Sequence, residues 1–123
     1  QGTGITICLL NNNYLGMVRQ MQELFYGKRY SATCLRRRPS CPGGCKGPND
    51  QCPEYVPDFV KLAESYGAKG IRVMRKEDIA AAFEQAKKET KIPTLIEFII
   101  DPEELVYPMV KPNGTLEDMI MDC

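Results

Sequence analysis

The sequence has no long apolar segment and no net charge, and its first residues do not resemble a secretory leader. Its most apolar stretches, such as Thr94 to Ile100 with Glu97 inside it, fall far short of the ~20 residues that a membrane span needs. Sixteen Lys and Arg balance sixteen Asp and Glu, which excludes a global field for capturing nucleic acid or an anionic membrane. Residues 1–10 lack the basic start and cleavage site of a signal peptide, so we expect a reducing, cytoplasmic location. A chain of 123 residues, 43% of them hydrophobic, allows one compact domain.

The zero net charge conceals a basic segment. Between Lys28 and Cys52, six cations and one anion give a charge of +5, and the remainder of the chain carries −5. The same segment holds three prolines, three glycines and four of the six cysteines, a density of helix and strand breakers that excludes regular structure. We therefore expect one long, basic, Cys/Pro/Gly-rich loop insertion over residues 28–55.

Outside this loop, strand patterns and helix patterns alternate. Short apolar runs with β-branched residues predict strands over residues 5–10, 68–74 and 93–100. Apolar positions at helical spacing predict helices over residues 15–25, 57–67 and 79–86, the second with Pro57 in its first turn. Gly27 follows the first helix where a C-terminal cap belongs, and Thr115 with Asp118 resembles a capping box for a short C-terminal helix.

Strands that alternate with helices of this length indicate βαβ units, a parallel sheet and right-handed crossovers. The predicted fold class is therefore α/β, a partial three-layer domain with a parallel sheet and the long loop insertion. The runs over residues 5–10 and 95–100 are typical of strands covered on both faces, with Cys8 as a small buried residue. Since three strands make a thin sheet, we expect residues 1–123 to be a fragment of a larger α/β domain.

Three consecutive asparagines, Asn11 to Asn13, follow the first predicted strand directly. Ligands of open α/β sheets bind at the carboxyl ends of the strands, and the Asn side-chain oxygen suits a hard cation such as Mg²⁺. The alternative is a plain strand-ending turn, because Asn tolerates left-handed backbone and bonds to its own main chain. The spacing by itself leaves both interpretations open.

Five stretches carry a more specific pattern: Leu9 to Arg19 (LLNNNYLGMVR), Gln22 to Tyr30 (QELFYGKRY), Pro57 to Gly67 (PDFVKLAESYG), Lys69 to Val73 (KGIRV) and Asp101 to Val110 (DPEELVYPMV). Together they resemble the large catalytic subunit of acetolactate synthase, also called acetohydroxyacid synthase. The resemblance covers nearly the whole chain except residues 34–55. It implies the C-terminal part of a Rossmann-like, thiamine-diphosphate-binding domain.

The resemblance also implies roles for single residues. The family's Mg²⁺ ligands from this motif correspond to the side chain of Asn12 and the main-chain carbonyl of Tyr14, and Asn13 with Leu15 and Gly16 would lie beside the diphosphate. Without the family, Gly16 is also consistent with a helix-start glycine. The aspartate ligand belongs to a Gly-Asp-Gly motif that this chain does not contain.

Two methionines correspond to the family's substrate and inhibitor channel. Met17 matches a channel methionine, although its spacing also suits a helix core. Met21 stands where the family has a Trp that favours 2-ketobutyrate over pyruvate and stacks on herbicidal inhibitors, and this chain has no Trp. We therefore expect a more pliable pocket, a weaker preference for 2-ketobutyrate and poor inhibitor binding.

The loop departs from the family, which has a far shorter link at this place. It presents Cys34, Cys41, Cys45 and Cys52 with six, three and six residues between them. Four thiolates could hold Zn²⁺ or an iron–sulfur cluster, although the spacing is not that of a common zinc finger; disulfides and free thiols are the alternatives. The basic run Arg36 to Arg38 could meet phosphate or nucleic acid, but a solvated loop is the usual outcome.

Two classes of function follow. The first is a piece of a thiamine-diphosphate- and Mg²⁺-dependent carboligase that condenses pyruvate with a second 2-ketoacid, with a related decarboxylase or oxidase as the enzymatic alternative. The resemblance implies a dimer or other homo-oligomer, further domains of the large subunit with FAD, and a regulatory small subunit. We expect the chain alone to be inactive, with no nucleic-acid or membrane partner. The second class is a stand-alone module that binds metal or nucleic acid through the Cys-rich loop.

Overall fold

The computed structural model describes residues 2–35 and 57–121, and it contains a three-stranded parallel sheet. The strands are β1 (Thr6–Asn11), β2 (Lys69–Val73) and β3 (Thr94–Ile99), in the order β1-β3-β2. The helices are α1 (Gly16–Phe25), α2 (Phe59–Ser65) and α3 (Ile79–Lys87), the last preceded by the 3-10 turn η1 (Lys76–Asp78). The three predicted strands and the three predicted helices up to residue 100 are therefore present, with ends that differ by at most two residues.

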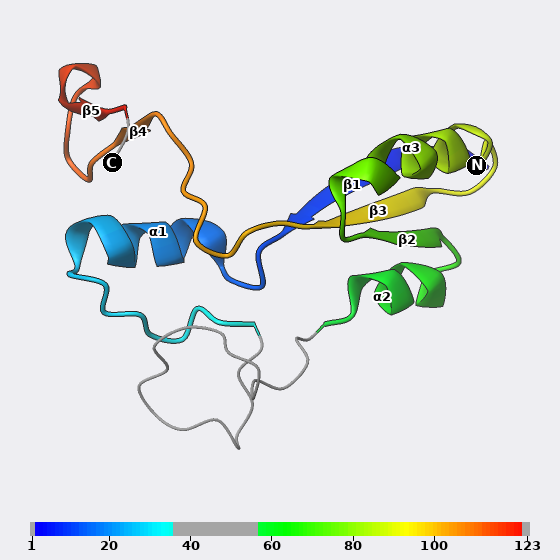
Figure 1. The fold of residues 1–123 in the computed structure, drawn as a ribbon, viewed down its shortest axis with the longest axis horizontal. Helices are drawn as coiled ribbons and strands as arrows, with labels where there is room; N and C mark the ends of the chain where they lie inside the picture. Colours follow the sequence, from blue (N-terminus) through cyan, green and yellow to red (C-terminus); the bar gives the residue numbers. More distant parts are fainter. Residues whose placement is uncertain (1, 36–56, 122–123) are drawn as a thin grey trace.

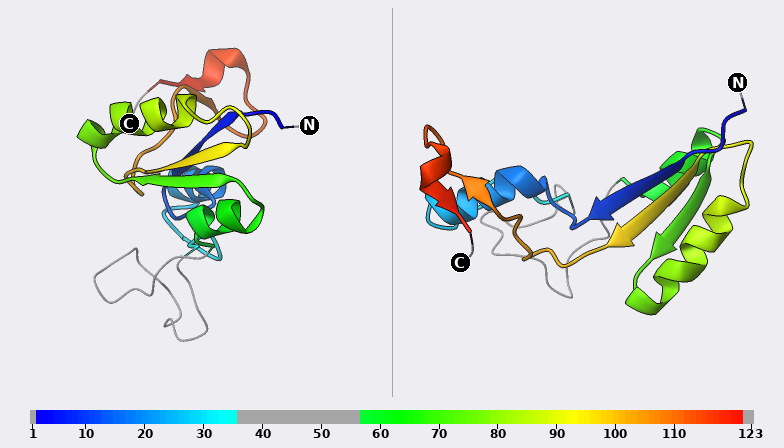
Figure 2. Two further views of the ribbon diagram at one scale, coloured as in Figure 1. Left: turned by 90° about the vertical axis from the view of Figure 1, so that its right-hand side faces the viewer. Right: turned by 90° about the horizontal axis from the view of Figure 1, so that it is seen from above.

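The sheet has helices on both faces, as a three-layer α/β arrangement requires. Helix α2 precedes β2 and lies on one face, whereas α3 connects β2 to β3 across the other (Figures 1 and 2). Residues Val73, Ala82, Ala86 and Ile96 form the buried core between α3 and the sheet. The parallel α/β class is confirmed.

Local sequence signals explain three of the helix ends. Asp58 caps α2 through its side chain, which accepts a hydrogen bond from the backbone N–H of Lys61 at 3.2 Å. Pro57 therefore lies before the cap and not in the first helical turn, which corrects the predicted start. Gly27 and Gly67 follow α1 and α2 with φ of 59° and 76°, the left-handed conformation that favours glycine after a helix.

Strand β1 corrects an expectation, because it is not covered on both faces. Ile7 and Leu10 are 45% and 65% exposed, and Cys8 is exposed rather than buried. Helices α2 and α3 pack over β2 and β3, which leaves β1 as an uncovered edge strand among the described residues. The apolar run predicted the strand correctly but not its surroundings.

A second half of the molecule lies beyond the carboxyl end of β1 (Figure 1). We call residues 2–11 and 57–100 the sheet half, and residues 14–35 and 101–121 the α1 half. The α1 half ends in a short hairpin of β4 (Met109–Val110) and β5 (Met119–Ile120). Between these strands, the 3-10 turn η2 (Leu116–Asp118) begins with the predicted capping box of Thr115 and Asp118, but it is a single turn.

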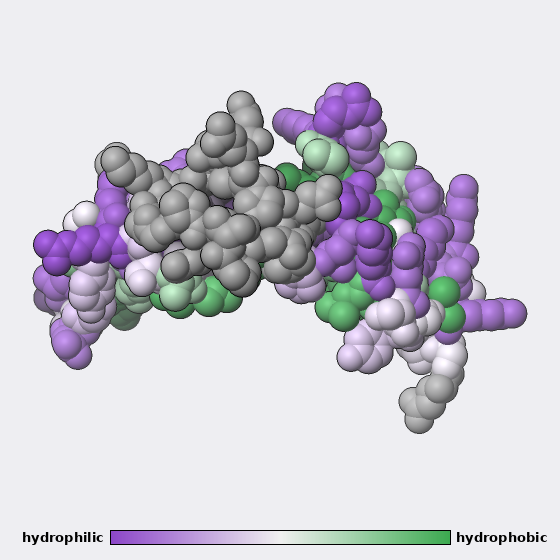
Figure 3. Space-filling model, turned by 90° about the horizontal axis from the view of Figure 1, so that it is seen from below, coloured by the Kyte–Doolittle hydropathy of each residue, from purple (hydrophilic) through white to green (hydrophobic). Residues whose placement is uncertain are grey.

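On the face that Figure 3 shows, hydrophilic and hydrophobic residues are mixed. Within the described ranges, no helix is long and apolar enough to cross a membrane. The greater part of the predicted 28–55 insertion lies outside the described residues. Its first described part, residues 28–35, contains no helix or strand.

Candidate functional site

The three asparagines form a turn between β1 and α1, at the junction of the two halves. The side-chain Oδ1 of Asn11 accepts a hydrogen bond from the backbone N–H of Asn13 at 2.8 Å, and Oδ1 of Asn12 accepts one from the N–H of Tyr14 at 3.1 Å. Asn13 has φ of 63°, in the left-handed region that Asn tolerates. The turn interpretation is thus confirmed, and it leaves each Asn oxygen with further capacity to accept.

The turn is held from its other side by the chain that follows α1. The N–H of Leu15 donates to the carbonyl of Thr33 at 2.8 Å, and the N–H of Leu35 donates to the carbonyl of Asn13 at 2.8 Å. These bonds place Cys34 opposite Tyr14 in an isolated antiparallel bridge. The backbone of the turn is therefore fixed by contacts on both flanks.

Cys34 has a free thiol and is partly exposed. Cys41, Cys45 and Cys52 lie outside the described residues. A Zn²⁺ or iron–sulfur site formed by the four cysteines therefore stays a prediction.

An ion-pair network with one fully buried member, Glu97, lies behind the turn. The Glu97 side chain, 0% exposed in the central strand, accepts hydrogen bonds from Nδ2 of Asn11 at 2.6 Å and from Nε of Arg72 at 2.7 Å. Arg72 Nη2 reaches Oδ1 of Asp58 at 2.7 Å, so the network runs from the cap of α2 to the turn. The backbone N–H of Lys61, with Arg72, lowers the pKa of Asp58 below its ordinary value.

Sequence reasoning gave Glu97 no place at the site. The available signal was its position as the only charged residue of an otherwise apolar strand, Thr94 to Ile100. A carboxylate there must find partners, because burying an unpaired charge is very costly.

Helix α1 buries a charged residue, Arg19, although its apolar stripe was expected to be the buried face. Arg19 is 3% exposed and pairs with Glu23 at 2.9 Å and Glu103 at 2.6 Å. Its guanidinium also lies over the rings of Tyr14 and Tyr30, 5.1 and 4.7 Å from their centroids. Arg19 therefore connects the turn, through Tyr14, to the segment after β3.

Electrostatics favour the charged forms of Arg19 and Glu23 in this cluster. Burial opposes the charge of Arg19, but Glu103 and Tyr30 outweigh it and raise the pKa of the guanidinium. Burial likewise opposes the charge of Glu23, yet the Tyr30 hydroxyl and the nearby cations lower its pKa below the ordinary 4.5. Burial and Glu23 raise the pKa of Tyr30. The cluster thus presents a fixed cation between two aromatic rings.

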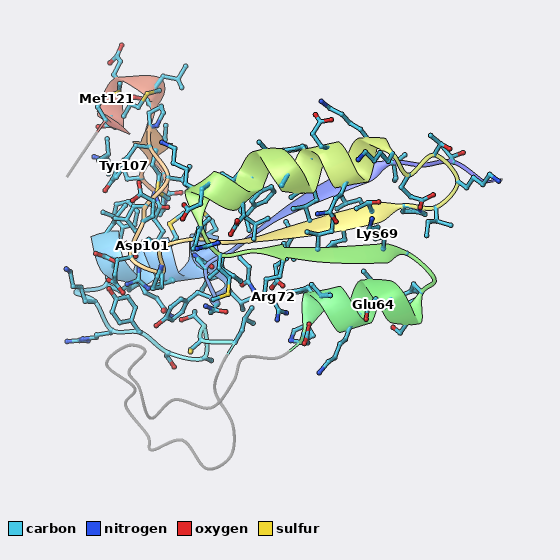
Figure 4. The ribbon with its side chains drawn as sticks, turned by 45° about the vertical axis from the view of Figure 1, so that its right-hand side comes forward. Glu64, Lys69, Arg72, Asp101, Tyr107 and Met121 are labelled. Atoms are coloured by element: carbon cyan, nitrogen blue, oxygen red, sulfur yellow. The ribbon has the colours of Figure 1, made fainter. Side chains whose placement is uncertain are left out.

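Gln20 is the second buried side chain of α1. Its Nε2 donates to the carbonyl of Val106 at 2.7 Å and to the sulfur of Met109 at 2.9 Å, and its Oε1 accepts from the N–H of Val106 at 2.9 Å. Figure 4 shows this segment, with Asp101 and Tyr107 labelled, running alongside α1. The Asp101 to Val110 stretch, one of the five that carry the family resemblance, is thus anchored to α1.

The two methionines predicted for the channel do not belong to a core among the described residues. Met17 is 55% exposed and Met21 is partly buried. They are four residues apart and therefore share a face of α1. This face is accessible, which excludes the core interpretation of Met17 within the described structure.

The residues of the turn fit a hard cation beside an anionic group. The amide oxygen of Asn12 and the carbonyl of Tyr14 are neutral oxygen donors of the kind that Mg²⁺ accepts. Oδ1 of Asn13 is buried and has no hydrogen-bond partner within the described part of the chain. A Cβ on Gly16 would lie 3.1 Å from Nδ2 of Asn12, so glycine gives the Asn12 side chain its room.

Comparison with known proteins agrees with the family resemblance found in the sequence. Residues 1–98 match the family model of the thiamine pyrophosphate enzyme, C-terminal TPP binding domain. The chain is 39% identical over 120 residues to an acetolactate synthase of Mycobacterium bovis and 39% identical over 119 residues to an acetolactate synthase large subunit of Corynebacterium glutamicum. It is 37% identical over 119 residues to the mitochondrial acetolactate synthase catalytic subunit of Saccharomyces cerevisiae. These alignments cover 97–98% of this chain but only 14–17% of the relatives.

Proposed function

We propose that this chain forms part of the large subunit of an acetolactate synthase, because it belongs to the family of thiamine pyrophosphate enzymes through their C-terminal TPP binding domain. The observation that carries the proposal is the Asn turn, which stands at the carboxyl end of β1 with oxygen donors suited to Mg²⁺. The identity to named acetolactate synthases over almost the whole chain supports this enzyme over other members of the family. The enzyme would condense pyruvate with a second 2-ketoacid to give acetolactate or acetohydroxybutyrate.

In this proposal, the side chain of Asn12 and the carbonyl of Tyr14 bind Mg²⁺, while Asn13, Leu15 and Gly16 lie beside the diphosphate. Thiamine diphosphate, when bound, supplies the electron sink for decarboxylation and for the new carbon–carbon bond. The residues of this chain bind and orient the cofactor. No acid or base among the described residues is assigned a proton transfer.

The remaining parts of the site are proposed to come from elsewhere. They are the aspartate ligand, the glutamate that activates the cofactor, the FAD-binding domain and a second subunit of a dimer. A regulatory small subunit and a cytoplasmic location complete the proposal. The chain by itself is therefore proposed to be inactive.

Met21 determines the second-substrate preference in this proposal. Its flexible side chain replaces an aromatic wall, so we expect the enzyme to discriminate weakly between 2-ketobutyrate and pyruvate. The change Met21→Trp should raise the preference for 2-ketobutyrate, measured as the ratio of acetohydroxybutyrate to acetolactate when both substrates compete. It should also strengthen inhibition by herbicides, measured by inhibitor titration. An unchanged ratio would contradict this role.

The first test concerns Asn12. In the full-length polypeptide that carries this chain, Asn12→Ala should weaken Mg²⁺-dependent binding of thiamine diphosphate by at least ~10-fold, because it removes a ligand oxygen. Calorimetric titration with the cofactor and Mg²⁺ gives the affinity directly.

The matched control is Asn113→Ala, an Asn in a turn of the β4–β5 hairpin that also has positive φ, 60°. It should leave the affinity unchanged. Equal affinity of the Asn12→Ala protein and the unmodified protein would overturn the assignment of Mg²⁺ to this turn.

A further inference from the structure

Glu97 is the most deeply buried charged group of the described structure and has no role in the site as proposed. Its side chain is 0% exposed and lies on β3, the central strand. Each carboxylate oxygen accepts a short hydrogen bond, Oε1 from Asn11 at 2.6 Å and Oε2 from Arg72 at 2.7 Å. Burial of an ion pair is weak evidence for stability, because desolvation offsets the attraction. Its place therefore calls for a second reason.

The hydrogen bonds of Asn11 supply that reason. A carboxylate only accepts hydrogen bonds, so Glu97 fixes the amide of Asn11 with its NH₂ toward β3. The amide oxygen must then point the other way, where it accepts from the N–H of Asn13 at 2.8 Å. Asn11 is 4% exposed, and its orientation is therefore determined by these partners.

The conformation of the turn follows from this orientation. The bond from Asn13 to Oδ1 of Asn11 spans residue 12 and holds Asn13 in its left-handed conformation, φ 63°. Asn12 lies within this bonded loop, and Tyr14 follows it directly. A flipped Asn11 amide would place an NH₂ group against the N–H of Asn13, and the loop would open.

We propose that Glu97 is a positioning residue, which orients the Asn11 amide and thereby sets the turn that presents the oxygens of Asn12 and Tyr14 to Mg²⁺. The identity of the cation rests on the proposed function. On the far side, Arg72 donates to Glu97 at 2.7 Å and also to Asp58 at 2.7 Å. The near end of the network, Asn11 with Glu97, should therefore affect Mg²⁺ binding. The far end, Arg72 with Asp58, should affect only the stability of the fold.

The test uses Glu97→Gln, which keeps the shape but makes one end of the side chain a donor. The amide introduced by this change cannot accept from both Arg72 and Asn11, so one bond is replaced by two facing donors. In the full-length polypeptide, Mg²⁺ affinity at saturating thiamine diphosphate should fall ~10-fold or more, the range seen when partners of metal ligands are changed. Calorimetry measures the affinity, and thermal unfolding is recorded beside it.

The double change Glu97→Gln with Asn11→Asp provides the rescue. The new amide at position 97 then accepts from Arg72 and donates to the new carboxylate at position 11. The other oxygen of that carboxylate accepts from the N–H of Asn13, and the total charge is unchanged. Affinity should return to within about threefold of the original. Asn11→Ala, which keeps the pair of Glu97 and Arg72, should weaken Mg²⁺ binding even where Glu97→Gln fails to fold.

Asp58→Asn is the far-end control and should lower the thermal midpoint with Mg²⁺ affinity unchanged. The inference is overturned if Glu97→Gln and Asn11→Ala bind Mg²⁺ like the original. It is equally overturned if all three single variants lose affinity in proportion to their loss of thermal stability. An unmodified polypeptide that binds no thiamine diphosphate would instead overturn the proposed function, and this inference with it.

Discussion

The sheet half and the α1 half are built by different interactions. In the sheet half, Ile96 and Val73 pack with small residues of α3, so the contact is apolar and non-directional. In the α1 half, the two buried residues of the helix are Arg19 and Gln20, each held by hydrogen bonds at defined distances. Met17 and Val18 of the same helix are about half exposed.

The difference shows that burial in this molecule follows position rather than residue type. An apolar core gains stability from area removed from water, whatever the detailed geometry. A buried guanidinium or amide is stable only if nearly every donor has a partner, so it also specifies orientation. Buried polar groups of both halves meet the Asn turn, where orientation matters for a ligand: Glu97 of the sheet half bonds to Asn11, and Arg19 of the α1 half lies over the ring of Tyr14.

The largest expected effect is in the sheet half. Ile96→Ala should lower the free energy of unfolding by ~2–5 kcal/mol, because it leaves a cavity in a fully buried position. Urea unfolding followed by circular dichroism measures it. Leu116→Ala, at a position 77% exposed, is the control and should change stability by less than ~0.5 kcal/mol. Equal effects of the two changes would contradict the assigned core.

A smaller effect is expected in the α1 half. Arg19→Met should cost ~2 kcal/mol, mostly from the lost contacts with two aromatic rings, since the partner Glu103 is largely exposed. Relative to the unmodified chain, the variant should show faster amide hydrogen exchange in α1 and an unchanged exchange rate in β3. Lys28→Met removes an exposed cation that pairs with Glu23 and should cost less than ~0.5 kcal/mol. If β3 exchanges faster as well, the two halves are not independent.

The smallest effect is the response to acid, which compares one carboxylate of each half. The pKa of Glu23 lies below its ordinary 4.5 and that of Asp58 below its ordinary 3.8. Between the lowered pKa of the folded chain and the ordinary pKa of the unfolded chain, the unfolded chain binds more protons. The stabilisation from each carboxylate is therefore complete above its ordinary pKa and is lost as the pH falls through its lowered pKa. Glu23→Gln should weaken the pH dependence of amide hydrogen exchange in α1. Asp58→Asn should do the same in α2. A pH dependence identical to the unmodified chain would contradict these pairings.

Sequence patterns predicted the secondary structure well, for reasons that particular residues illustrate. The strand over residues 94–99 and the end of α1 at Gly27 depend on local rules, namely β-branched apolar runs and left-handed caps. Pro57 was misplaced because Asp58, a better cap, competes for the start of α2. Cys8 was misjudged because an apolar run predicts a strand and not the presence of neighbours on its faces.

The candidate site was only partly predictable. The Asn turn and the accessible methionines were found from motif and family resemblance. The network of Glu97, Arg72 and Asp58 was not, because its members are separated in sequence and meet only across β2, β3 and the cap of α2. Arg19 was missed because helical periodicity treats the apolar stripe as the buried face.

The sequence alone determined what depends on neighbours within a few residues: the order of strands and helices, several helix ends and the presence of a turn at the three asparagines. The tertiary structure alone decided which side chains are buried and how the amide of Asn11 points. Main-chain preferences are local, so they can be read along the chain. Burial and the partner of a buried polar group depend on residues brought together from distant positions, as Glu97 and Asn11 are, 86 residues apart.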